Sequence, residues 1–205
     1  MGEGASVTEK EFSIWVAPHG RSQRLLAQLI FSLSEQYNSP TFVPHVTLLG
    51  SLHGHYESME PKCSQLSSKL RPYTIRLTGV EYVDKFISNS SEAPTRIKGS
   101  PPRGHLYHNH VMIARAEKTE NVLKANLIAR GIFDSQNDPP YFPHASILYA
   151  KLSPALKEQA IKQAARYLPL GFEVDELRLV DTTEEDPRSY AVAYAAAKAF
   201  PFGHA

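Results

Sequence analysis

Two short strings in this sequence place a histidine two residues before a hydroxyl side chain. His45-Val46-Thr47 and His144-Ala145-Ser146 each follow a proline and precede an aliphatic residue and a leucine. In a β-strand, residues i and i+2 point to the same face, ~6–7 Å apart. Each histidine would therefore project together with its hydroxyl, while Val46 and Ala145 would turn to the opposite, core side.

Histidine and hydroxyl pairs of this kind suit phosphodiester hydrolysis. Imidazole titrates near neutral pH, so one of two histidines can accept a proton from water while the other donates one to the departing oxygen. Neutral hydroxyls can donate hydrogen bonds to the other phosphate oxygens. Two such pairs surrounding one phosphate would open a cyclic phosphate without a metal ion or any other cofactor.

The two strings lie in surroundings that repeat, and each half is predicted to run strand, helix, motif strand, helix, strand. A strand is also predicted at the end of the chain, over Ser189–Ala196. The first half is expected to contain strands over Phe12–Ala17 and Tyr73–Val83 and helices over Arg21–Tyr37 and Glu60–Leu70. The second half is expected to contain strands over Val111–Ala116 and Phe172–Val180 and helices over Asn121–Arg130, stopped by Gly131, and Pro154–Tyr167.

A connector over about residues 85–106 separates the halves and is rich in Ser, Pro, Gly and Asn without an apolar period. Such a composition is typical of a loop or linker. The 205 residues are therefore predicted to form a single bilobal domain, with halves at about 11–83 and 107–181.

With these motifs in tandem halves, the chain resembles the two-histidine phosphoesterase superfamily. PHVTLLG and PYFPHASILYA are most similar to the plant and fungal cyclic nucleotide phosphodiesterases, as is FSIWVAP with the apolar helix after it. The resemblance implies an α+β, bilobal, pseudo-symmetric fold. In this fold two antiparallel sheets flank a central cleft, with helices outside.

The resemblance also implies an activity and a role for each site residue. The reactions would be hydrolysis of ADP-ribose 1″,2″-cyclic phosphate to the 1″-phosphate and of nucleoside 2′,3′-cyclic phosphates to 2′-phosphates. His45 and His144 would be the acid and base, Thr47 and Ser146 the phosphate donors, and Tyr149 a ligand-binding aromatic. We expect His144 to activate water and His45 to protonate the leaving oxygen, although the sequence allows the reverse.

Composition favours a small ligand over long nucleic acid. Lys plus Arg number 22 and Asp plus Glu 21, a net charge of +1, whereas proteins that grip long nucleic acid carry a basic excess. The single cysteine, Cys63, excludes an intrachain disulfide, and no signal peptide or membrane-spanning stretch is visible. A cytoplasmic monomer acting on a small cyclic-phosphate nucleotide is therefore predicted.

Two other interpretations stay open, and a third is disfavoured. An RNA-end-processing or 2′-5′ RNA ligase-like enzyme would prefer oligonucleotides, and an inactive nucleotide-binding module would bind without turnover. A serine hydrolase built on His144 and Ser146 lacks the glycines of a nucleophile elbow.

Some other residue types could also do chemistry. His105, His108 and His110 suggest a metal site, but no acidic residue near them in the sequence completes one. Trp15 and Tyr82 could stack on a base, although core packing is the expectation for aromatics in strands. Arg103 could reach a phosphate from the connector.

Overall fold

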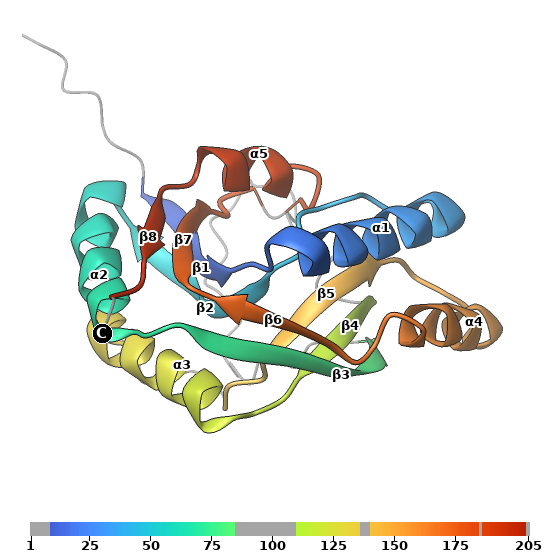
Figure 1. Cartoon of the computed structure of the whole chain (residues 1–205). Helices are drawn as coiled ribbons and strands as arrows, with labels where there is room; N and C mark the ends of the chain where they lie inside the picture. Colours follow the sequence, from blue (N-terminus) through green and yellow to red (C-terminus); the bar gives the residue numbers. More distant parts are fainter. Residues whose placement is uncertain (1–8, 85–109, 136–139, 185, 204–205) are drawn as a thin grey trace, which may run out of the picture.

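The structure is a computed structural model that describes residues 9–84, 110–135, 140–184 and 186–203. It is an α+β fold in which helices pack on a curled antiparallel sheet (Figure 1). The strands are β1 (Lys10–Val16), β2 (Val46–Gly54), β3 (Tyr73–Val83), β4 (Val111–Ala116), β5 (His144–Tyr149), β6 (Leu170–Val174), β7 (Glu176–Asp181) and β8 (Ala199–Pro201). The helices are α1 (Gly20–Tyr37), α2 (Tyr56–Lys69), α3 (Glu120–Phe133), α4 (Pro154–Ala165) and α5 (Tyr190–Ala196).

The sheet order is β6-β3-β4-β5-β2-β1-β7-β8, and neighbouring strands are antiparallel. Its centre is its weakest junction, because β2 and β5 pair through Val46 and Ala145 alone. Two antiparallel sheets of four strands each therefore meet at one residue pair. The predicted α+β fold of two antiparallel sheets with helices outside is confirmed.

The two sequence halves are interlocked in space. The last strand of the first half, β3, pairs with β4 of the second half, and β7 pairs with β1 of the first. The helices are exchanged as well, since α2 packs under β7 and β8 and α3 under β2, while α1 packs under β5 and β6 and α4 under β3 (Figure 1). Helix α3 also reaches β3 of the other sheet. Each sheet consequently depends on both halves of the chain.

The two faces of the sheet differ in what covers them. The main hydrophobic core lies between the sheet and the helices α1 to α4. Among the described residues, four buried apolar side chains lie outside this core, namely Trp15, Val111, Ile113 and Val180. The strand register puts Trp15 opposite Thr47, and Ile113 opposite Ser146. Cross-strand partners share a face, so these apolar residues line the face that carries the motifs.

The prediction of a last strand over Ser189–Ala196 is wrong, because this segment forms α5. The alternation of Tyr190, Val192 and Tyr194 resembles a strand, but four alanines in the segment favour a helix. Tyr190 and Tyr194 are then one turn apart, on one helix face, and both contact Trp15. The short strand β8, which follows α5, was not predicted.

Two further details differ from the expectations. The single strand predicted over 172–180 is broken at Asp175 into β6 and β7. Helix α3 continues through Gly131 to Phe133, and the residue after it, Asp134, caps the helix with a left-handed φ of 56°.

The sequence pattern places Val122, Leu123, Leu127 and Ile128 on one apolar side of α3, but the buried face only partly coincides with that side. Leu123 and Leu127 are 40% and 70% exposed, whereas Ala125, Asn126 and Ala129 are buried. Small alanines let the helix approach the sheet closely. Within the described residues, we find no helix with the length and apolar character needed to cross a membrane.

Candidate active site

The two motifs meet at the single residue pair that joins the two sheets. Val46 and Ala145 are the middle residues of His45-Val46-Thr47 and His144-Ala145-Ser146, and both are buried on the core side. Because the strands are antiparallel, this register places His45 across from Ser146 and Thr47 across from His144. Each histidine is therefore next to two hydroxyls, one from its own strand and one from the other.

Side chains hold the two motif strands where backbone pairing between them ends. Asn126 Nδ2 donates to the Leu48 carbonyl over 2.7 Å, and the Tyr141 hydroxyl donates to the Thr47 carbonyl over 3.0 Å. On the other strand, Ser39 Oγ donates to the Tyr149 carbonyl over 2.8 Å. Carbonyls that would otherwise be unsatisfied are paired in this way, and the strands can diverge without losing their positions.

The two imidazoles are oriented in the same way. His45 Nδ1 lies 2.7 Å from the Val43 carbonyl, and His144 Nδ1 lies 2.8 Å from the Phe142 carbonyl. A carbonyl oxygen can only accept, so Nδ1 must carry the proton in both rings. The Nε2 atom of each histidine is then the one that can take or give a proton.

The surroundings of the two histidines nevertheless differ. His45 is 7% exposed and stacks on Trp15, with ring centroids 3.6 Å apart and planes inclined by 7°. Tyr190 of α5 packs edge-on against Trp15 with centroids 5.2 Å apart. His144 is half-buried and lies beside the exposed Phe142 ring, with ring centroids 5.5 Å apart. The expectation that Trp15 fills the core misses this arrangement, because Trp15 lies on the motif face.

Burial lowers the pKa of both histidines. Burial lowers the pKa of His45 to about 4; the hydrogen bond to Val43 opposes this shift, and the charge of His144 adds to it. Burial also lowers the pKa of His144, against the hydrogen bond to Phe142. His45 is consequently neutral at neutral pH.

The predicted ligand-binding residues lie around these histidines. Thr47 and Ser146 are half-buried, and Ser146 hydrogen-bonds with the Tyr149 side chain. The Tyr149 ring packs edge-on against Phe42 with centroids 4.9 Å apart. The structure thus brings together all five predicted site residues on β2, β5 and the residue preceding β2.

Three residues near His144 were missed by the sequence analysis. Arg115 is the cross-strand partner of His144 on β4, and Phe142 precedes His144 by two residues. Lys118 lies 5.9 Å from the centre of the Phe142 ring. The sequence did contain a signal for Arg115, because it is the one charged residue of the apolar strand VMIARA. A charged side chain there must face away from the core.

The histidine cluster proposed as a metal alternative is only partly described. His105, His108 and also Arg103 lie outside the described residues. His110 Nδ1 lies 3.2 Å from an Asp84 oxygen, and Lys157 binds the same carboxylate. Among the described residues, no three His, Cys, Asp or Glu side chains gather as a metal site.

Tyr82, the other aromatic considered for base stacking, holds neighbouring parts of the chain together. Its hydroxyl hydrogen-bonds with the carbonyl of Ala150 and accepts from the Leu152 amide, and Lys157 lies 4.4 Å from its ring centre. These bonds hold the segment between β5 and α4 against β3.

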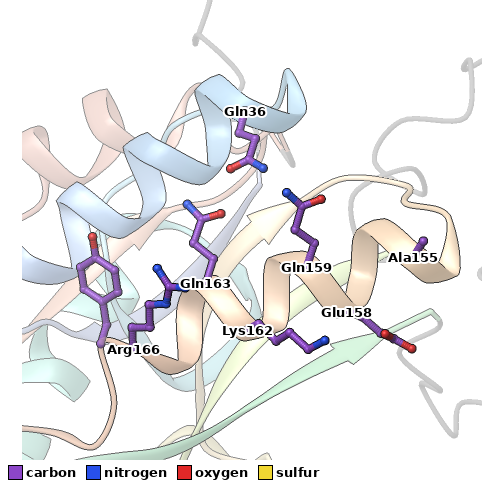
Figure 2. A pocket seen from close by; sticks show the side chains of 8 residues that line it. Gln36, Ala155, Glu158, Gln159, Lys162, Gln163 and Arg166 are labelled. Carbon is purple, nitrogen blue, oxygen red and sulfur yellow. The ribbon is translucent and has the colours of Figure 1, made fainter.

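Two cavities occur elsewhere in the described part of the molecule. Figure 2 shows one of about 650 Å³, where Gln36 of α1 faces Gln159 and Gln163 of α4. A second, of about 900 Å³, lies between α5 and the N-terminus of α2, beside Phe12 and Tyr56. No motif residue lines either cavity, so cavity size is a poor guide to the chemistry here.

A tandem-repeat α+β fold with paired His-x-Thr/Ser motifs defines a two-histidine phosphoesterase. The chain belongs to the 2′-5′ RNA ligase superfamily, whose family model matches residues 18–186.

Individual relatives are distant. The chain is 24% identical over 184 residues to a protein of Arabidopsis thaliana named Cyclic phosphodiesterase, covering 88% of this chain and 90% of the relative. A crystal structure of a Thermus thermophilus protein matches with a TM-score of 0.52 and 18% identity, covering 83% of this chain and 87% of that one. Another, described as a phosphoesterase, matches with a TM-score of 0.50 and 12% identity, covering 95% and 96%. At such identities the crystal structures show a shared fold alone.

Proposed function

We propose that this protein hydrolyses small cyclic phosphodiesters. ADP-ribose 1″,2″-cyclic phosphate would give the 1″-phosphate, and nucleoside 2′,3′-cyclic phosphates would give 2′-phosphates. The observation that carries the proposal is the pairing of Val46 with Ala145, which sets each histidine across from the hydroxyl of the other motif. The name of the Arabidopsis relative supports the same class of reaction.

The register suits displacement at phosphorus. Diagonal neighbours on paired strands lie roughly 7–8 Å apart, so the two imidazoles can flank a phosphate held between them. One Nε2 takes a proton from water as the water oxygen bonds to phosphorus. The other Nε2 donates a proton to the ribose oxygen as its bond to phosphorus breaks. Thr47 and Ser146 donate to the remaining phosphate oxygens.

The different exposure of the two histidines favours a definite division of roles. A histidine with a pKa of about 4 is almost wholly neutral at pH 7, which suits a base. We therefore assign water activation to His45 and protonation of the leaving oxygen to the more exposed His144. This reverses the order expected from the sequence, where the environment of each histidine was invisible.

An assay of product identity tests the proposed function. ADP-ribose 1″,2″-cyclic phosphate, the four nucleoside 2′,3′-cyclic phosphates and a cyclic-phosphate-ended oligonucleotide would each be supplied with and without EDTA. We expect EDTA-resistant turnover of the small substrates to the 1″- or 2′-phosphate. Exclusive 3′-phosphate products or EDTA-sensitive turnover would contradict the mechanism. A strong preference for the oligonucleotide would favour the RNA-processing alternative.

A further inference from the structure

The two flanks of the paired motifs carry different side chains on the motif face. On the β1 and β7 flank, the cross-strand partner of Trp15 is Arg178. The Arg178 guanidinium is already bound by Glu176 at 3.0 Å and the Ala197 carbonyl at 3.2 Å, and lies 4.8 Å from the Tyr194 ring centre. Its side chain is 26% exposed. Helix α5 therefore covers this flank, and the Arg178 guanidinium already has hydrogen-bond partners there.

On the β4 and β3 flank, no helix of the described residues is placed as α5 is on the other flank, and a cation lies beside His144. Arg115 is the cross-strand partner of His144, so the two side chains leave the same face of the sheet. The Arg115 side chain is 54% exposed, and within the described residues its ion-pair partner is a Glu81 oxygen 3.6 Å from Nε. An exposed ion pair of this length is weak, which leaves the guanidinium available to an anion.

A glycine on the neighbouring strand gives the Arg115 side chain its path. Gly79 is the partner of Arg115 on β3, and a Cβ at position 79 would lie 3.5 Å from one terminal guanidinium nitrogen and 3.9 Å from Nε. The side chain therefore lies across β3 over the position where another residue would have a side chain. This holds the guanidinium roughly two strand spacings, about 10 Å, from β5.

The repeat shows that this cation belongs to one motif only. Trp15 pairs with Thr47 as Ile113 pairs with Ser146, so the residue matching Arg115 in the first half is Ala17. In the described part of the chain, a cation beside one of the two histidines suits a substrate that has a second anionic group on one side of its cyclic phosphate.

We propose that Arg115 binds a second phosphoryl group of the substrate, carried on the 5-position of the ribose that bears the cyclic phosphate. The ribose ring would bridge the gap between the paired motifs and the guanidinium. Planar guanidinium groups bind phosphate oxygens through two parallel hydrogen bonds. The inference rests on the proposed function, and it makes Arg115 a residue that selects cyclic phosphates with a 5-phosphoryl group, as in ADP-ribose cyclic phosphate, over simple cyclic nucleosides.

The test compares two ligands in binding and two substrates in turnover. Adenosine 2′-phosphate and adenosine 2′,5′-bisphosphate would be titrated by calorimetry into the wild-type protein and the R115Q, R115K, E81Q and R24Q variants. Adenosine 2′,3′-cyclic phosphate with and without a 5′-phosphate would then be compared by kcat/KM. Arg24 is an exposed arginine on α1, so R24Q matches the change of charge at a remote place.

We expect the wild type to prefer the 5′-phosphorylated member of each pair by about tenfold or more, as for a charged hydrogen bond. R115Q should reduce the ratio towards one and R115K should retain part of it. E81Q should raise the ratio by removing the competing carboxylate, and R24Q should leave it unchanged. An unaltered ratio in R115Q, or a fall in E81Q, would overturn the inference.

Two further measurements identify which kind of molecule carries the second phosphate and whether failure lies in the anion site or in the proposed hydrolysis. A loss in R115Q with ADP-ribose 1″,2″-cyclic phosphate supports a pyrophosphate as the group, whereas a loss confined to a cyclic-phosphate-ended dinucleotide would overturn the small-molecule source. Binding preference without turnover in the wild type would refute the proposed function and still support the anion site. Turnover of the cyclic phosphates without a preference for the 5′-phosphorylated member would support the proposed function and refute the anion site at Arg115.

Discussion

Trp15 and His45 stack face to face across neighbouring strands, with ring centroids 3.6 Å apart. His144, the other motif histidine, is half-buried and lies beside the exposed Phe142, with ring centroids 5.5 Å apart. Two motifs that are nearly equivalent in sequence thus present chemically different imidazoles. The first is held neutral by its surroundings, and the second is closer to water.

Replacing Trp15 by alanine should raise the pKa of His45 towards the ordinary histidine value. The reason is that burial is the largest cause of the lowered pKa, and Trp15 supplies one side of that burial. The measurement is an NMR titration of the His45 ring, with the acid limb of the pH–rate profile moving upward in parallel. W15F should shift the pKa less than W15A. A pKa that falls instead would mean that attraction between the indole face and the imidazolium outweighs desolvation.

The stability of the protein should decrease as the pH is lowered from about 6.5 to about 4. His45 has a lower pKa in the folded state than in the unfolded state, so the unfolded chain binds more protons in this interval. The contribution is present above the unfolded pKa and is lost by up to about 3 kcal/mol towards the folded pKa. Urea unfolding of the wild type and of H45Q at several pH values measures it. If the free energy of unfolding changed equally with pH in both proteins, His45 would not be the source of the lost stability.

Replacing either motif histidine by alanine should reduce kcat by a factor of at least ~10², the usual contribution of general acid–base catalysis. His53, an exposed histidine on β2, offers the matched control, and H53A should retain wild-type activity. Rates would be measured alongside thermal unfolding, so that loss of folding is recognised. Intact turnover in H45A or in H144A would refute the two-histidine mechanism.

Asn126 should contribute to both stability and activity, although it does not contact the substrate in our proposal. Its side chain is 5% exposed and donates to the Leu48 carbonyl on the first motif strand. In N126L this buried carbonyl loses its partner, which should cost about 1–3 kcal/mol of unfolding free energy. The exposed Asn121 on the same helix provides the control variant N121L. Denaturant unfolding that does not separate the two variants would show that the bond is dispensable.

The sequence predicted most of the elements that support the proposed site and gave the residue types on which the proposal rests. The spacing of His45 with Thr47 and of His144 with Ser146 is local, as are the apolar alternation in β3 and the short apolar run of β4 that gave the bounds of these strands. Local periodicity failed where two patterns competed. An alanine-rich segment with alternating tyrosines became α5, and small alanines set the buried face of α3.

Tertiary structure alone decided how the two halves combine and why they differ. The exchange of β3 and β7 between the sheets depends on pairing between residues far apart in the chain, which no local pattern encodes. The stacking of Trp15 on His45 and the position of Arg115 beside His144 likewise follow from strand register. The types and spacing of the motif residues are fixed by the covalent chain, whereas their burial, and hence their pKa values, depends on neighbours brought together only by folding.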